Sequence, residues 1–366
     1  MSAKREDRAG PVDDASTVAA AAKLWDPEPG YLNTSSFGLP PRPGWDALQL
    51  SLEEWRTGRT SWEGWAASVD ESRGLFADLL GVPATTVATG ATVSQMLAPV
   101  AAAIPDGSVV LVPDIEFTSN VFPWATHADR GVRVRSAPTA GFLEAIGPDV
   151  DVIAWSAVQS ATGEVADSAA IGRAARDVGA LTVLDATQAA GWLALDASGI
   201  DLLVCTAYKW LCSPRGSGFL VHHPELPDRH PELRLKPLAA NWFAGQEVHE
   251  SYYGLPLRLA TDARRFDISP AWHCWVGTAP ALRVVASVGM RAIGGHNVAL
   301  ANAFLTAMDQ PPSNSAIVSV PADDDAVARL HAAGVRFGIR AGRVRVAFHL
   351  YSTEADVELA VRALRG

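Results

Sequence analysis

Six short apolar segments between residues 84 and 225 constrain the fold of this chain more than any other feature. They are rich in Val, Ile and Leu and lack the polar alternation of a half-exposed strand: 108–112, 132–136, 150–155, 181–184, 202–207 and 218–222. Strands with this pattern are buried on both faces, as in a parallel sheet covered by helices. Helical segments such as 168–178 separate them. The sequence therefore predicts an α/β fold with a mostly parallel central sheet.

The flanking segments predict how the chain divides into parts. Residues 1–20 are polar, charged and Ala-rich, which indicates a flexible N-terminal arm. We expect a large α/β domain over 21–265 and a smaller α+β C-terminal domain over 266–366. Other expected elements are helices over 41–80, long loops over 224–270, a helix over 272–293, strands at 316–320 and 344–348, and a closing helix from about 354.

Composition excludes several classes of function. The chain has 366 residues and a net charge of −10, which opposes binding to nucleic acid. No apolar run approaches the roughly 20 residues of a membrane span, and the N-terminus lacks the apolar core of a signal peptide. Cys205, Cys212 and Cys274 lack metal-type spacing, and His222–His223 lack a third ligand. We therefore expect a cytoplasmic protein without disulfides, metal, nucleic acid or membrane as partners.

Two charged residues follow strongly apolar strands. Asp185 comes directly after 181–184, and Lys209 follows 202–207. Ligands of such sheets bind beyond the carboxyl ends of the strands, where an unpaired buried charge would be costly. A lysine can form a Schiff base with the aldehyde of pyridoxal phosphate, and an acid can keep a proton on its pyridine nitrogen. The pair therefore predicts a pyridoxal phosphate site for Lys209 and Asp185, although either residue alone could be an ordinary turn or surface residue.

A glycine-rich entry to a helix follows Gly90. Thr92 and Gln95 have the spacing of a capping box, and an apolar helical pattern comes after them. A helix N-terminus of this kind offers free backbone N–H groups and the positive end of the helix dipole, which suit a phosphate. The pattern is equally consistent with a plain cap.

Several motifs, in this order and spacing, resemble those of the class V, fold-type I pyridoxal phosphate enzymes. This superfamily includes cysteine desulfurases, kynureninases and isopenicillin N epimerases. The resemblance covers residues 30–365. It rests on Tyr31-Leu-Asn-Thr-Ser-Ser-Phe-Gly, Gly90-Ala-Thr-Val, Glu116-Phe-Thr-Ser-Asn-Val-Phe-Pro-Trp, Asp185-Ala-Thr-Gln, Thr206-Ala-Tyr-Lys, Ser213-Pro-Arg-Gly-Ser-Gly and Arg345-Val-Ala-Phe-His-Leu-Tyr-Ser-Thr.

The resemblance implies a role for each matched residue around the cofactor. Lys209 would carry the imine and later move protons, while Asp185 would pair with the pyridine nitrogen. Gln188, with either Gln159 or Ser160, would bind the phenolic oxygen of the ring. The remaining cofactor contacts would be Ala91, Thr92, Thr206 and Tyr208 around the phosphate, Phe117 stacked on the ring, and Ser269 donated by the partner subunit of a homodimer.

The resemblance also implies a substrate side of the site. Arg345 would bind the α-carboxylate of an amino acid, since the planar guanidinium meets a carboxylate bidentately. The segment that contains Ser36 would line the substrate pocket, and Trp242 in the long loop would join it. A surface position on a strand is the alternative for Arg345.

Two departures from the family pattern narrow the reaction. Desulfurases stack a histidine on the ring, where this chain has Phe117, and they carry a nucleophilic cysteine shortly before the carboxylate-binding arginine. The corresponding region, 335–344, has no cysteine, and Cys205 lies within a predicted strand. We therefore expect the enzyme not to be a cysteine-dependent desulfurase.

The reaction that fits best is β-elimination from an S-substituted cysteine, a C–S lyase reaction, through the Lys209 aldimine and a quinonoid. It needs no extra nucleophile. Aminotransferase activity is the second candidate because it needs only Lys209, and kynureninase-like or oxidative-decarboxylating chemistry of secondary metabolism is also compatible. Epimerisation requires a second base on the opposite face, which Phe117 cannot supply. A non-catalytic homologue is disfavoured because Lys209, Asp185, Gln188 and Arg345 are all present.

Overall fold

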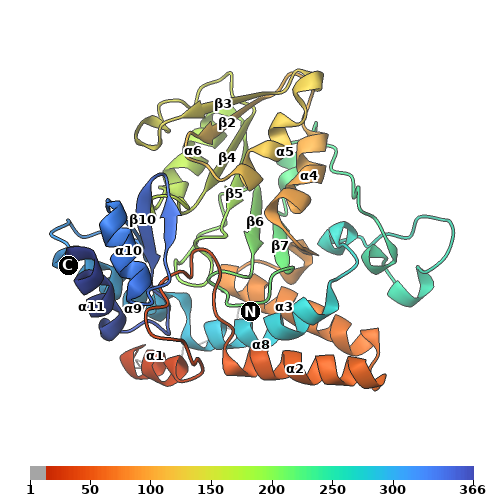
Figure 1. Ribbon diagram of the computed structural model, residues 1–366. Helices are drawn as coiled ribbons and strands as arrows, with labels where there is room; N and C mark the ends of the chain where they lie inside the picture. Colours follow the sequence, from red (N-terminus) through yellow and green to blue (C-terminus); the bar gives the residue numbers. More distant parts are fainter. Residues whose placement is uncertain (1–13) are drawn as a thin grey trace, which may run out of the picture.

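The computed structural model describes residues 14–366, and its centre is a seven-stranded sheet (Figure 1). Six of the seven strands point in one direction, and only β7 is antiparallel to its neighbours. The order is β1-β7-β6-β5-β4-β2-β3. The strands are β1 (Val87–Gly90), β2 (Val109–Pro113), β3 (Arg133–Ala137), β4 (Val152–Ser156), β5 (Leu181–Asp185), β6 (Leu202–Thr206) and β7 (Gly218–His222).

Helices cover both faces of this sheet, which explains the unbroken apolar strands. Leu111, Ile153 and Leu203 pack on one face with residues of α3 (Trp62–Leu80), α6 (Ser168–Val178) and α8 (Trp272–Val288). Val110 and Val152 face the opposite side and pack against α4 (Val93–Ala103). All five residues of β2, β4, β5 and β6 are buried, as predicted. The prediction of burial on both faces is wrong for β3, an edge strand in which only Ala137 is buried and polar residues alternate with Val134. The predicted fold-type I α/β class is confirmed.

A second, smaller sheet lies beside the large one, at the blue end of the chain in Figure 1. Ala341 and Gly342, both with positive φ, form the two-residue turn between two of its strands, as in a type I′ hairpin. The three-residue strand in front of this turn was not predicted. The sheet is antiparallel in the order β8 (Ile317–Val320), β10 (Arg343–Ala347), β9 (Gly338–Arg340), and it packs with α9 (Met290–Ala307), α10 (Asp324–Ala332) and α11 (Glu354–Arg365).

The segment predicted as one helix over 272–293 forms two helices, and the first of them packs on the large part of the molecule. Instead of one helix over 272–293, α8 ends at Gly289, whose positive φ breaks the helix before α9 begins. The predicted domain boundary before residue 266 places α8 in the small domain, but α8 packs on α2 (Arg42–Thr57) and α3 of the large part. These three helices form the layer beneath the sheet in Figure 1.

Part of the segment 1–20, which was predicted to be a flexible arm, is helical. Residues 14–22 form α1 (Asp14–Ala22), which packs on α8 and α9 and buries Val18 and Ala21. The high helix propensity of this Ala-rich stretch and its apolar contacts explain the difference. Residues 1–13 lie outside the described part of the chain.

The N-terminal segment joins the two sheets at the site. Leu32 exchanges backbone hydrogen bonds with Arg336 and Ala347 of the small sheet region. Further on, the Gly38 N–H donates to the Tyr208 carbonyl at 2.8 Å. A Cβ at Gly38 would lie 2.0 Å from the Lys209 carbonyl oxygen, so only glycine permits this close approach. The contact places Ser35 and Ser36 beside Lys209. Over residues 14–366, no helix combines the length and apolar character needed to cross a bilayer.

Candidate active site

A cavity of about 220 Å³ opens at the carboxyl ends of the central strands. Ser156, Asp185 and Thr206 are the last residues of β4, β5 and β6, and Lys209 follows three residues after β6. Parallel strands bring these positions to one edge of the sheet. The lining consists of Ser35, Ser36, Thr92, Val93, Phe117, Ser119, Ser156, Ser160, Asp185, Thr187, Gln188, Thr206, Tyr208, Lys209, Arg215 and Arg340.

Lys209 lies at the wall of this cavity and is only 7% exposed. Its Nζ is 5.6 Å from the centroid of the Phe117 ring and 5.8 Å from that of Tyr208. Burial lowers the pKa of Lys209 to about 8, against the opposing influence of the Asp185 carboxylate. A substantial fraction of this amine is therefore neutral near physiological pH, the form that forms imines and accepts protons.

Asp185 is the buried acid of the site. One carboxylate oxygen accepts a hydrogen bond from the Thr187 N–H at 2.8 Å. Burial raises the pKa of Asp185, while the Thr187 hydrogen bonds and the charge of Lys209 act in the opposite direction. An acid in these surroundings is stabilised by a cationic partner, and a protonated pyridine nitrogen is a partner of this kind.

Arg345 is fully buried behind two serines of the cavity wall. Its Nη1 donates to the carbonyl and hydroxyl of Ser160, and its Nη2 donates to the Ser36 hydroxyl at 2.9 Å. Burial and the nearby Arg340 lower the pKa of Arg345 to about 10. No carboxylate of residues 14–366 pairs with it, and its Nε has no hydrogen-bond partner there. A buried guanidinium without a counter-ion favours an anion from outside the chain.

Gln188 ties the cavity floor to the surrounding core. Its amide nitrogen donates to the Ser35 carbonyl and the Ser160 hydroxyl, and its amide oxygen accepts from the Trp210 indole at 2.8 Å. Of the two alternatives Gln159 and Ser160, Ser160 lines the cavity. The Gln159 amide nitrogen instead donates to Glu116 at 3.0 Å.

The N-terminus of α4 forms the opposite end of the cavity. The Thr92 hydroxyl caps this helix by accepting from the Gln95 N–H at 3.2 Å. The Gln95 side chain accepts from the Ala91 N–H, so the expected capping pair is present but reaches one residue further back. Thr92 and Val93 line the cavity where the first N–H groups of a helix have no partner within that helix. This end suits a phosphate.

The guanidinium of Arg215 and the hydroxyl-bearing side chains of Tyr208 and Thr206 complete this end of the cavity. Arg215 stacks on the Tyr208 ring, with its guanidinium carbon 4.5 Å from the ring centroid. Thr206 lines the same wall and donates its N–H to the Thr187 hydroxyl. Arg215 makes no ion pair with the described carboxylates, so its charge is available to a bound anion.

Four predicted site residues do not line the cavity of this chain. Arg345 lies behind the wall, and the Ala91 N–H is occupied by Gln95. Ser269 is exposed on the surface. Trp242 was expected in the substrate pocket but belongs to an aromatic cluster with Trp62, Trp272, Tyr252 and Phe243. The long loop has no periodicity that could have indicated this packing.

Sequence reasoning assigned no role to Glu116, a buried acid next to Phe117. Its carboxylate accepts from the backbone N–H of Phe117 and of Ser156, from the Ser156 hydroxyl and from Gln159. Burial raises the pKa of Glu116, while the bonds from Ser156 and Gln159 oppose that rise. These bonds fix the loop that carries Phe117 to the end of β4. The sequence could have indicated this role, because Glu116 is the first residue of a motif that the family resemblance already contained.

Arg215, Arg340, Ser119, Ser156 and Thr187 are further cavity residues without an earlier assignment. Arg215 lies within the motif that begins at Ser213, and Ser156 ends an apolar strand, so both positions carried a signal. Arg340 lies on the short strand β9, where the sequence pattern gives none.

A lysine and an acid at the carboxyl ends of adjacent strands, opposite a helix N-terminus, define a fold-type I pyridoxal phosphate enzyme. The sequence model of the aminotransferase class V family matches residues 56–337. The chain belongs to this family, and its cofactor is pyridoxal phosphate. The group fits the residues present, because Lys209, Asp185 and the α4 terminus offer an amine, a buried acid and a phosphate site around one cavity.

Known proteins resemble this chain over different lengths. It is 28% identical to "Uncharacterized aminotransferase YcbU" of Bacillus subtilis over 247 residues. This match covers 65% of this chain and 64% of that protein. The match therefore spans less than two thirds of the Bacillus protein. Isopenicillin N epimerase of Streptomyces clavuligerus is 27% identical, with 94% and 96% covered. The solved structure of the cystine C–S lyase C-DES shares the fold with a TM-score of 0.81 at 19% identity, covering 92% of this chain and 97% of that one.

Proposed function

We propose that this enzyme catalyses β-elimination from an S-substituted L-cysteine, giving a thiol, pyruvate and ammonia. The observation that carries the proposal is that Lys209 is the one amine lining the described cavity and that burial lowers its pKa to about 8. Elimination requires a single base that removes the Cα proton, followed by loss of the thiolate from Cβ. Water completes the balance when the released aminoacrylate hydrolyses to pyruvate and ammonia.

The residues around Lys209 divide the work of this reaction. When bound, pyridoxal phosphate supplies an electron sink for the electrons left on Cα. Asp185 would hold a proton at the pyridine nitrogen, and Phe117 would offer the ring an apolar surface that cannot exchange protons. Arg345 binds the α-carboxylate after Ser36 and Ser160 release its Nη groups. Fixing the carboxylate orients the Cα–H bond toward Lys209.

The positions of the cysteines support elimination over desulfuration. Cys205 and Cys212 are buried, and burial raises the pKa of both thiols. The Cys274 thiol donates to the Arg215 carbonyl and does not line the cavity. Relatives named "Probable cysteine desulfurase" also match this chain. We favour elimination over desulfuration because no cysteine lines the described cavity.

Transamination is the second candidate, because Lys209 alone could move the proton from Cα to the cofactor carbon. The name of the Bacillus relative agrees with it. Kynureninase-like cleavage is compatible with Phe117 but requires an aryl-ketone pocket. Epimerisation requires a base facing Lys209 across the substrate, and Phe117 occupies the face where the family places its stacking residue.

We also propose that the enzyme works as a homodimer in which Ser269 reaches the partner's phosphate site. Its exposure, away from the cavity of its own chain, supports this arrangement. Sedimentation velocity measures the dimer, and a S269A variant that binds pyridoxal phosphate as tightly as the natural enzyme would exclude the contact.

The test is an assay of the purified holoenzyme with a panel of amino acids and S-alkyl-L-cysteines. Stoichiometric thiol, pyruvate and ammonia support elimination. A keto acid together with the amino form of the cofactor identifies transamination, and alanine with persulfide identifies desulfuration. C274A is the matched control: elimination continues without this thiol, whereas desulfuration through Cys274 stops. A protein that stays colourless with added cofactor, with no borohydride-fixed adduct at Lys209, would refute the catalytic assignment.

A further inference from the structure

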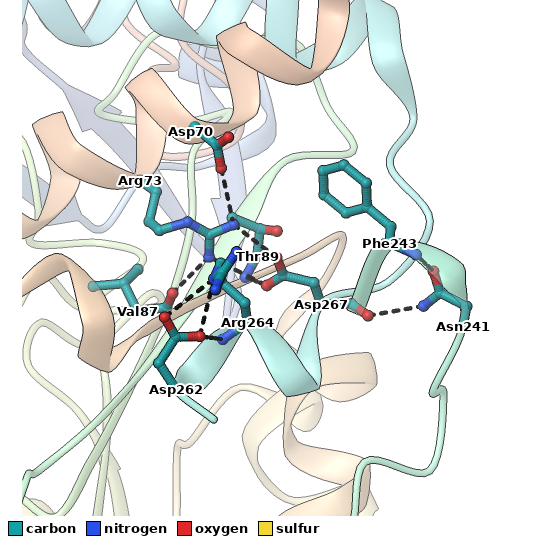
Figure 2. Close-up of polar contacts among 9 residues, drawn as sticks. All are labelled: Asp70, Arg73, Val87, Thr89, Asn241, Phe243, Asp262, Arg264 and Asp267. Atoms are coloured by element: carbon teal, nitrogen blue, oxygen red, sulfur yellow. Dashed lines mark hydrogen bonds and ion pairs between the residues drawn. The ribbon is translucent and has the colours of Figure 1, made fainter. Parts of the chain in front are cut away.

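A buried ion pair lies outside the cavity, on the far side of strand β1 (Figure 2). Arg73 of α3 is 5% exposed, and Asp267, just after the 3-10 turn Ala263–Phe266, is 1% exposed. The guanidinium meets the carboxylate bidentately, with Nη2–Oδ2 at 2.7 Å and Nη1–Oδ1 at 3.2 Å. Asp70 lies 3.5 Å from the same guanidinium but is exposed. A pair this deeply buried costs desolvation energy, so its position calls for a role.

Both members of the pair bind the backbone of β1. Arg73 Nη1 donates to the Val87 carbonyl at 2.6 Å, and the Thr89 N–H donates to Asp267 Oδ1 at 2.7 Å. Strand β1 is the edge of the large sheet and pairs only with β7. Its outer N–H and C=O groups would otherwise be buried without partners. The ion pair satisfies the Val87 C=O and the Thr89 N–H in place of a neighbouring strand, as the dashed contacts in Figure 2 show.

Strand β1 runs directly into the phosphate end of the cavity. Gly90 ends the strand, and the first cavity residue of α4 is Thr92. The turn between them is tight, because a Cβ at Gly90 would lie 2.5 Å from the Met96 side chain. A shift of β1 is therefore transmitted to the helix N-terminus, where the direction of the N–H groups decides how well a phosphate binds.

Asp267 also binds the start of the 241–267 loop. The Asn241 side chain donates to the Asp267 carbonyl at 2.9 Å, and the Ile268 N–H donates to the Thr89 carbonyl at 3.4 Å. The ends of the 241–267 loop are thus joined to each other and to β1. Ser269 follows two residues later.

We infer that Arg73 and Asp267 are positioning residues for the cofactor phosphate: they fix β1, and through it the turn from Gly90 to Thr92, by acting as the missing edge partner of that strand. The inference rests on the cofactor site described above but not on which reaction follows. Neither residue contacts the cavity, so neither is a catalytic residue.

The experiment compares D267N and R73K with a matched control, D201N, in the full-length protein. Asp201 is also a buried acid in an ion pair, 2.8 Å from Arg229, but it precedes β6 at the opposite end of the sheet. Each apoprotein is titrated with pyridoxal phosphate and with pyridoxal, which lacks the phosphate, and the Kd values are read from absorbance. Thermal unfolding is recorded alongside.

We expect D267N to raise the Kd for pyridoxal phosphate at least tenfold while changing the Kd for pyridoxal less than threefold. R73K keeps the charge but loses the bidentate contact, so we expect a smaller change of the same kind. D201N lowers Tm without changing either Kd.

The inference is overturned if D267N and R73K lower Tm like D201N but leave the Kd for pyridoxal phosphate unchanged. Equal losses for pyridoxal and pyridoxal phosphate would also overturn it, because the effect would not concern the phosphate. If D267N does not fold, R73K alone decides between these outcomes. Failure of the elimination assay leaves all these titrations valid, so the two proposals fail separately.

Discussion

Replacing Lys209 with methionine should stabilise the cofactor-free protein. Burial lowers the pKa of Lys209 from 10.5 to about 8. One pKa unit corresponds to about 1.4 kcal/mol, so holding the ammonium in this cavity costs the folded state about 3 kcal/mol at pH 7. Methionine fills a similar volume without a charge. Asp185 loses the attraction of the ammonium in the variant, so we expect a net gain of about 1 to 3 kcal/mol in the free energy of unfolding.

The pH dependence has a definite sign. Well below pH 8 the amine is protonated in both the folded and the unfolded chain, and the full cost applies. Between pH 8 and 10.5 the folded protein releases the proton while the unfolded chain keeps it. The natural apoprotein should therefore gain stability as the pH rises through this window, by about 1.4 kcal/mol per pH unit from this residue. K209M lacks that contribution, and the part of the difference between the two proteins that comes from the ammonium charge vanishes above pH 10.5.

Urea unfolding of both apoproteins at pH 7, 8, 9 and 10 measures this difference. D185N and the double variant K209M/D185N serve as controls, because they separate the cost of burying the amine from its attraction to Asp185. Equal unfolding free energies at pH 7, together with parallel stability curves from pH 8 to 10, would show that the amine is not buried as a cation. The placement of Lys209 in the cavity wall would then be wrong.

Three other substitutions test single contacts of the site. G38A places a methyl group against the Lys209 carbonyl and should cost about 1 to 3 kcal/mol in urea unfolding, whereas G74A, at a helical position of α3 with open space around it, should cost less. E116Q turns an amide N–H₂ toward two of the four donors, since each Glu116 oxygen accepts two hydrogen bonds, and should lower stability by about 1 to 3 kcal/mol and shift the cofactor absorbance; an unchanged spectrum would dissociate Glu116 from Phe117. R345K loses the planar fork, and kcat/KM should fall by about 10- to 150-fold, mainly through KM; an unchanged KM would place the substrate carboxylate elsewhere.

The sequence predicted the parts of the fold that local pattern determines. Most strands buried on both faces are apolar throughout, so the pattern of Val, Ile and Leu predicted their positions. Strand β1 is also buried, but it is short and contains Thr89 and Gly90, and the pattern did not predict it. Because Asp185 and Lys209 follow two of these strands, their convergence followed from the topology of parallel sheets. The reversed direction of β7 depends on pairing with β1 and β6, which no local pattern records.

Contacts between segments far apart in the sequence could not be predicted either, because no local pattern records them. Arg73 and Asp267 are 194 positions apart, and each alone is an ordinary charged residue. Trp242 lies in an aperiodic loop, and its partners Trp62 and Trp272 come from two separate helices. The break at Gly289 falls inside an otherwise continuous helical pattern, because a single glycine does not by itself end a helix.

The charges of the cavity indicate the state for which the site is built. Asp185, Lys209 and Arg345 are buried, and burial moves the pKa of each toward its neutral form. A chain optimised for its own stability would replace such groups with apolar ones. In the function that we propose, each group instead matches one element of the bound state: a protonated ring nitrogen, an aldehyde and a carboxylate. The energy that burial costs the empty protein is therefore recovered only on loading, and binding of cofactor and substrate should stabilise this protein more than the number of new contacts suggests.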